Sequence, residues 1–171
     1  MNVTRLPHGT AAPAVTRPGR AAEILCVEAL DAELRAEHHR IRRAVFVDEQ
    51  GMFAGSDVDE HDTEDDVVHV VALRDDRPVG AVRLYLLDEQ AGLWQGDRLA
   101  VLPDCRTCGA GGPLVRFAVA YAGAHGGRRM VAHIQPPNVR FFERLGWSVY
   151  RPPEDYLGHL HHPMHIALVG G

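Results

Sequence analysis

Arg106-Thr107-Cys108-Gly109-Ala110-Gly111 is the stretch of this sequence that decides its fold, and Gly112 and Pro113 follow it directly. An apolar run ends just before this stretch, and a helix is predicted to begin at Gly111. Glycines let the backbone approach a ligand closely, because they carry no Cβ atom. The free N–H groups at the start of the helix favour a phosphate or pyrophosphate group. The stretch therefore predicts a phosphate-binding loop between a strand and a helix.

Two familiar nucleotide-binding motifs do not fit this loop. No Lys-Ser or Lys-Thr pair follows the glycines, which excludes the Walker pattern, and the glycine spacing is not that of a Rossmann site. A glycine-rich connection that binds no ligand is the alternative interpretation of this segment taken by itself.

Around the loop, the hydrophobic pattern predicts a mixed α/β domain in the order β-α-β-β-β-α-β-α-β-β. Helices are expected over residues 32–47, 111–124 and 139–145, with Asp31 and Asn138 capping the first and the third. Strands are expected at residues 23–30, 67–73, 79–87, 93–102, 128–134, 147–151 and 162–169. Residues 1–20 lack periodicity, so we expect a flexible tail there and a single domain at 21–171.

Composition argues against several classes of protein. The 171 residues carry a net charge of −5, whereas a general nucleic-acid binder is usually basic. No apolar run approaches the length of about 18 residues that a membrane-spanning helix needs. The cysteines, Cys26, Cys105 and Cys108, are too few and odd in number for a disulfide scaffold. We therefore expect a cytoplasmic protein that binds neither nucleic acid nor membrane.

Four ordered segments resemble the GNAT superfamily of acyl-CoA N-acyltransferases. Arg106-x-x-Gly109-x-Gly111 resembles the family's pyrophosphate loop, and the preceding residues 98–103 resemble the strand that pairs with the pantetheine arm of coenzyme A. Residues 138–147 resemble the family's Asn…Phe-Tyr-Glu-Lys-Leu-Gly-Phe segment, and residues 43–51 with 59–62 resemble one GNAT subgroup. Residues 132–135, 138–147 and 161–164 are similar, more narrowly, to a bacterial subgroup associated with nitrilase gene clusters.

The resemblance implies a GNAT fold, with a mixed, mostly antiparallel central sheet flanked by helices. It implies an enzyme that moves an acetyl or short acyl group from acetyl-CoA or another acyl-CoA to a primary amine of a small molecule, by direct attack. The residues that it implies in CoA binding are Leu99, Val101, Arg106, Cys108, Gly109, Ala110, Gly111, Gly112, Asn138, Phe141 and Arg144. A homodimer is compatible with exposed terminal strands.

One position departs from the family pattern in a way that concerns catalysis. Phe142 stands where the family has the tyrosine that acts as the usual acid, and a phenyl ring cannot donate a proton. Either another residue or water replaces that acid, or the protein is a CoA-binding module that has lost catalysis. Tyr150 and Tyr156 are the alternative hydroxyl donors, although each can also be an aromatic core residue of a strand.

Three residues are candidates for the base that takes a proton from the amine. Period-two alternation places Asp97 on the strand face of Leu99 and Val101, although this carboxylate can also belong to a solvated turn. His133 and His162 lie in predicted strands and carry the side chain that suits proton transfer near neutral pH. Both histidines can equally be structural.

Acidic residues upstream are candidates for the acceptor side of the site. Glu49, Asp59 and Asp62 would attract a cationic amine if they border the pocket, and would otherwise belong to a solvated surface.

No metal is expected in this protein. The segment 159–165 is rich in histidine, but His159, His161 and His165 would share one face of a strand and His162 the other. Cys105-x-x-Cys108 alone suggests a redox pair, but its place on the predicted pyrophosphate loop argues against a dedicated redox role and leaves Cys108 prone to oxidation.

Overall fold

A computed structural model describes residues 23–170 of the chain, and one eight-stranded sheet organises it. The strand order is β1-β2-β3-β4-β5-β8-β6, and β7 pairs with β8. The strands are β1 Ile24–Glu28, β2 Val68–Arg74, β3 Arg77–Asp88, β4 Leu93–Val101, β5 Arg129–Ile134, β6 Ser148–Val149, β7 Glu154–Tyr156 and β8 His159–Ala167. All pairings are antiparallel except that of β4 with β5. The predicted mixed, mostly antiparallel sheet is thus confirmed.

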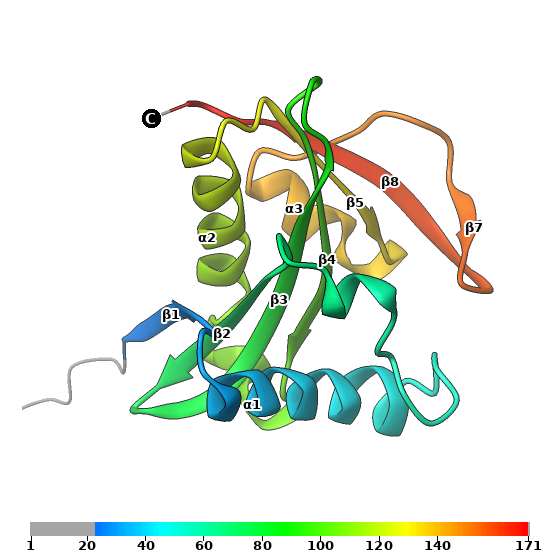
Figure 1. The fold of residues 1–171 in the computed structure, drawn as a ribbon. Helices are drawn as coiled ribbons and strands as arrows, with labels where there is room; N and C mark the ends of the chain where they lie inside the picture. Colours follow the sequence, from blue (N-terminus) through cyan, green and yellow to red (C-terminus); the bar gives the residue numbers. More distant parts are fainter. Residues whose placement is uncertain (1–22, 171) are drawn as a thin grey trace, which may run out of the picture.

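Three α-helices flank the sheet: α1 Ala32–Arg42, α2 Gly111–Ala124 and α3 Val139–Arg144 (Figure 1). α1 continues as a π-helix, η1 Arg43–Glu49, and three short 3-10 turns are η2 Glu60–Thr63, η3 Pro103–Cys108 and η4 Pro136–Asn138. The carboxylate of Asp31 caps α1 as predicted, because it accepts a hydrogen bond from the Leu34 N–H at 2.8 Å. Asn138 occupies the predicted N-cap position of α3, but its side chain makes no capping hydrogen bond.

The sheet separates two hydrophobic cores. Leu114 of α2 and Phe142 of α3 belong to the core on one face, and Ile41 of α1 packs with Val71 of β2 on the other. Because both faces of the central strands are covered, β2 is buried continuously from Val68 to Ala72 instead of alternating.

β4 is bent at the point where the sheet opens. β4 and β5 pair from Leu93 with Arg129 to Gln95 with Val131, and beyond these positions they separate. The register between β3 and β4 shifts between Ala81 and Arg83, and Arg98 takes a φ of +51°. An extra residue on one strand of a pair bends that strand and increases its twist. The bulge at Arg98 therefore turns β4 away from β5.

The C-terminal region differs most from the predicted elements. β8 begins at His159 instead of 162 and forms a hairpin with β7, which the sequence analysis missed.

The helix predicted over 32–47 is α-helical only to Arg42. The tail predicted at 1–20 lies outside the described residues. Within residues 23–170, no helix has the length and apolar character needed to cross a membrane.

Candidate active site

A pocket lies where β4 and β5 separate, with about 830 Å³ of empty space that is partly open to solvent. Its walls are mainly apolar, as is usual for a small-molecule site. The apolar side chains that line it include Phe46, Met52, Phe53, Leu99, Met130, Ile134, Phe142 and Trp147. Among the predicted catalytic residues, Asp97, His133 and Tyr156 line this pocket.

Asp97 lies in the pocket wall, but its carboxylate is bound to Arg83. The two oxygens accept hydrogen bonds from Arg83 Nε at 2.8 Å and from Nη2 at 2.6 Å. Leu99 and Val101 pack into the core beneath α2, whereas Ala100 belongs to the core beneath α1. Asp97 was predicted to share a strand face with Leu99 and Val101, and this prediction is wrong. The bulge at Arg98 interrupts the alternation of side chains along β4.

His133 and Tyr156 form a stacked pair in the pocket wall, with ring centroids 4.1 Å apart and an interplanar angle of 1°. His133 Nε2 lies 2.9 Å from Oε1 of Glu154, and a neutral ring that donates this N–H leaves Nδ1 unprotonated. Nδ1 is buried and has no hydrogen-bond partner within the described part of the chain. Burial, together with the charge of Asp97, raises the pKa of Tyr156, so its hydroxyl remains protonated at neutral pH.

His161 and Glu154 are residues of this site that the sequence analysis did not assign to catalysis. His161 is only 3% exposed, and its ring makes a T-shaped contact with Tyr156 at 5.3 Å. Its Nδ1 lies 2.9 Å from the His159 carbonyl oxygen, and burial lowers its pKa, so the ring is neutral. The β7–β8 hairpin brings Glu154 and His161 near Tyr156, because Glu154 pairs with His161 and Tyr156 pairs with His159. Recognising this hairpin in the sequence would have identified both residues.

Tyr150 and His162, the other predicted catalytic residues, are not part of the pocket lining. The Tyr150 ring has the guanidinium groups of Arg129 and Arg151 within 4.6 and 5.0 Å of its centroid. His162 follows His161 on β8, and alternation along a strand directs the two side chains to opposite faces. The structure therefore separates these two candidates from the stacked pair.

The predicted phosphate loop leads directly into α2. Gly109 takes a φ of +81°, a left-handed conformation that glycine adopts without strain. Ala110 precedes the helix and offers no side-chain hydrogen bond to its first turn. The guanidinium of Arg116 folds back over this turn, since a Cβ added at Gly112 would lie 3.2 Å from Arg116 Nη1. Open amides and a nearby cation suit an anion.

The side chains just before this loop are engaged with one another. Arg106, which was predicted to bind CoA, forms an ion pair with Glu49. Glu49 was predicted to bind the amine. Cys105 and Cys108 form a disulfide with their Cα atoms 5.0 Å apart, so the oxidation-prone Cys108 has no free thiol here. This disulfide closes the turn that precedes Gly109.

α3 contributes aromatic side chains to the same region. Phe141 packs against the start of α2, where a Cβ added at Gly111 would lie 3.3 Å from its ring. Phe142 is 5% exposed and makes a T-shaped contact with Trp147 at 5.4 Å. Of the other residues implied in CoA binding, Asn138 lines the pocket and Arg144 is exposed in the last turn of α3.

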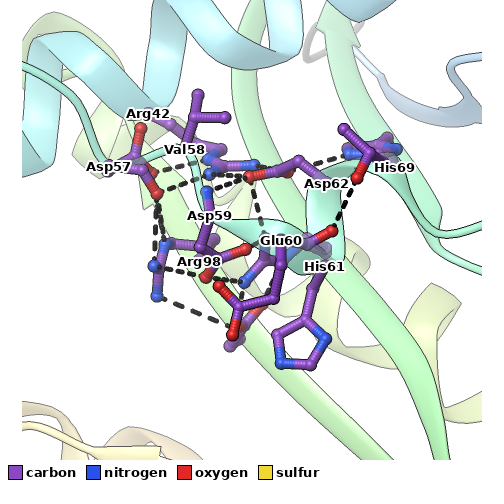
Figure 2. A network of polar contacts seen from close by, with 12 residues as sticks. Arg42, Asp57, Val58, Asp59, Glu60, His61, Asp62, His69 and Arg98 are labelled. Carbon is purple, nitrogen blue, oxygen red and sulfur yellow. Dashed lines mark hydrogen bonds and ion pairs between the residues drawn. The ribbon is translucent and has the colours of Figure 1, made fainter.

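The acidic stretch folds into a network of ion pairs (Figure 2). Its members are Arg42, Asp57, Asp59, Asp62, Arg83, Asp97 and Arg98. Burial alone would raise the pKa of Asp62, but hydrogen bonds from His69 and Arg42 lower it below its ordinary range. Asp62 is 7% exposed and Asp59 binds Arg83 at 2.5 Å. Neither belongs to the pocket lining, and Asp62 is not part of a solvated loop.

Similarities to known proteins agree with this geometry. Residues 28–147 match the acetyltransferase (GNAT) family. A Bacillus subtilis (strain 168) relative, the uncharacterized N-acetyltransferase YjcF, is 32% identical over 114 residues, which are 67% of this chain and 78% of the relative. A Lactobacillus plantarum protein assigned as an N-acetyltransferase superposes with a TM-score of 0.75 at 26% identity, covering 85% of this chain and 99% of that one. An acyl-CoA N-acyltransferase from Pseudomonas aeruginosa has the same fold, with a TM-score of 0.70 at 22% identity over 84% of this chain and 98% of its own. From the sheet that opens between β4 and β5, the glycine loop before α2 and these similarities, we conclude that the chain belongs to the acetyltransferase (GNAT) family.

Proposed function

We propose that this protein transfers an acetyl or short acyl group from acyl-CoA to a primary amine of a small molecule. The observation that carries the proposal is the stacked pair of His133 and Tyr156 in the wall of the pocket. Acyl transfer to an amine needs one group that removes a proton and one that returns a proton to the leaving thiolate. These two side chains supply both groups within one site.

The start of α2 is the proposed position for the pyrophosphate of the donor substrate. Residues 109–112 place open backbone amides there, and Gly109 has no atom within 4 Å of the point where a Cβ would lie. Arg116, which folds over Gly112, adds a positive charge that the sequence analysis did not include. Arg106, on the turn before the loop, forms an ion pair with Glu49. Backbone amides, a helix start and two cations together match a pyrophosphate group.

The bulge in β4 supports placing the thioester in the pocket. The register shift opposite Ala81–Arg83 takes one residue of β4 out of the regular ladder. A backbone N–H released in this way can polarise a thioester carbonyl that lies against β4, in surroundings that exclude most water. The strained conformation of Arg98, with its φ of +51°, is consistent with a functional role for the bulge.

In the proposed reaction, the amine nitrogen bonds to the thioester carbonyl carbon, and the proton that the nitrogen loses passes to Nδ1 of His133, which a turn of the ring must first open to the pocket. Glu154, 2.9 Å from His133 Nε2, stabilises the imidazolium that forms. The Tyr156 hydroxyl gives a proton to the sulfur as the carbon–sulfur bond breaks, and the phenolate then regains a proton from the His133 imidazolium through solvent, which restores both groups. The raised pKa of Tyr156 keeps its hydroxyl protonated for the first of these steps. Because Tyr156 supplies the proton, the absence of a hydroxyl at Phe142 does not prevent the reaction.

The lining also supports an inference about the acceptor. Phe46, Met52 and Phe53 contribute apolar surface to the pocket, and the carboxylate of Asp97 is neutralised by Arg83. An amine with an apolar body fits this lining better than a polycation, because the lining offers little uncompensated negative charge.

The proposal is tested by incubating the purified protein with acetyl-CoA and a panel of small amines, and following free CoA thiol. We expect amine-dependent thiol release, with a kcat lowered about 100-fold or more in His133→Gln and in Tyr156→Phe. Tyr150→Phe is the matched control and should retain activity, since Tyr150 does not line the pocket. If the protein binds acetyl-CoA but no amine releases thiol, it is a CoA-binding module and not an acyltransferase.

A further inference from the structure

Three imidazole rings meet beneath α1, away from the pocket. His38 and His39 come from α1 and His69 comes from β2, so residues 30 positions apart are brought together by the fold. The ring centroids of His38 and His69 are 4.7 Å apart, and that of His39 is 5.6 Å from each of them. One ring nitrogen from each residue lies within 4.8 Å of one from the others. His38 and His69 are 0% and 1% exposed, whereas His39 is half-buried.

The hydrogen bonds of the two buried rings fix their tautomers. His38 Nε2 lies 3.1 Å from the Val82 carbonyl oxygen, and His69 Nε2 lies 3.1 Å from Oδ1 of Asp62. A carbonyl and an ionised carboxylate can only accept, so both Nε2 atoms carry the proton and donate it. In the neutral form of each ring, Nδ1 then has a free lone pair.

The Nδ1 atoms of all three rings lack partners. Those of His38, His39 and His69 are buried, and no hydrogen-bond donor reaches any of them from residues 23–170. Buried polar atoms are nearly always satisfied, so a cluster of three that are not requires an explanation. A cation bound by the three lone pairs satisfies all of them at once.

We propose that His38, His39 and His69 form a binding site for a divalent transition metal, with Zn²⁺ as the best match. Three neutral imidazoles with an open fourth position are an established ligand set for zinc. The contacts from His69 to Asp62 and from His38 to a carbonyl are the outer hydrogen bonds that orient metal-bound histidines.

The geometry requires only a modest closure. Tetrahedral zinc, with Zn–N distances of about 2.1 Å, holds its nitrogens about 3.4 Å apart. Nitrogens within 4.8 Å of one another must therefore approach by up to about 1.4 Å, and the half-buried ring of His39 is the one free to turn. A turn of this half-buried ring would also open a path for the metal from solvent.

The site would fasten α1 to the sheet and does not belong to the acyl-transfer pocket. None of the three histidines is among the residues that line that pocket. His69 is joined through Asp62 to Arg42, so a bound metal would stabilise the ion-pair network. No metal was expected because the histidines at 159–165 were the group considered. The structure instead brings His38 and His39 together with His69, which is far from them in the sequence.

The experiment uses the full chain produced without a histidine tag and stripped with a chelator. Co²⁺ is added first, because it gives a visible absorption band when bound tetrahedrally, and Zn²⁺ binding is then measured by calorimetry. We expect one equivalent of either metal to bind, and Zn²⁺ to raise the unfolding temperature. In His39→Gln, Zn²⁺ affinity should fall about tenfold or more.

His39→Gln is the chosen variant because a half-buried side chain can change without unfolding the protein, which circular dichroism of the metal-free variant confirms. His159→Gln, in the other histidine-rich segment, is the matched control and should keep full affinity. The proposal is overturned if no stoichiometric metal binds. It is equally overturned if His159→Gln abolishes binding while His39→Gln retains it.

Discussion

Arg83 and Asp97 face each other across β3 and β4, joined by two hydrogen bonds of 2.8 and 2.6 Å. Burial alone would lower the pKa of Arg83, but hydrogen bonds to Asp97 and Asp59 raise it above its ordinary value. The pair holds β4 to β3 immediately before the bulge at Arg98. Asp97 therefore serves the shape of the pocket, and its negative charge is compensated.

The first prediction concerns the stability that this pair provides. Asp97→Asn should lower the free energy of unfolding by about 3 kcal/mol, because it leaves a fully buried guanidinium without one of its partners. Arg83 keeps Asp59 and Asp62, which limits the loss. Urea denaturation at pH 7 measures this change in the free energy of unfolding. Asp104→Asn, which breaks an exposed pair with Arg77, should cause no measurable change.

A different result for Asp97→Asn would change the proposed mechanism. If stability is unchanged while activity disappears, Asp97 acts on the amine and His133 is not the base.

The sequence was sufficient where local chemistry determines the structure. Gly109 and the open start of α2 could be predicted because a left-handed turn and a helix start depend on residues adjacent in the chain. The period of the apolar residues likewise placed the strands from 67 to 102 to within a few positions.

The sequence was insufficient where distant residues decide the outcome. Gly96, two residues before Arg98, is compatible with a bulge but does not fix its position, and the bulge reversed the predicted face of Asp97. Asp62 was predicted as a surface or acceptor residue because its partners, Arg42 and His69, come from other elements. Buried ion pairs of this kind depend on the assembled fold, and charge patterning along the chain does not show them.

The second prediction separates CoA binding from backbone strain. Gly109→Ala and Gly126→Ala each place a Cβ in open space at a positive φ, of 81° and 78° respectively. Both should lower stability by about 1 kcal/mol. Only Gly109 lies in the proposed pyrophosphate loop, so only Gly109→Ala should raise the KM for acetyl-CoA. Equal KM values in the two variants would remove the loop from the donor site.

The third prediction concerns acid stability. Burial alone would raise the pKa of Asp59, but hydrogen bonds and charge from Arg83, together with the charge of Arg98, lower it. The unfolded carboxyl has a pKa of about 3.9, so below about pH 5 the unfolded state binds more protons than the folded state. The contribution of Asp59 is thus complete above that pH and is lost as the pH falls through the folded pKa.

Asp59→Asn should therefore flatten the fall of unfolding free energy between about pH 5 and 3, relative to the unchanged protein. Denaturation curves across this range measure the slope. Asp66→Asn, in an exposed part of the same segment, is the control and should leave the slope as it is. An unchanged slope in Asp59→Asn would show that the Arg83–Asp59 contact contributes little.

The fourth prediction asks whether the acid can be moved within the pocket. Phe142 lines the pocket and its ring is fixed against Trp147, at the position where the resemblance to GNAT enzymes expects a tyrosine. In a Tyr156→Phe background, Phe142→Tyr should restore kcat by about tenfold or more, because it returns a hydroxyl to the site. As a control, Phe117→Tyr on α2 should give no rescue, since Phe117 is not part of the pocket lining. If Tyr156→Phe alone retains full activity, then Tyr156 is not the acid, and the stack with His133 only positions the base.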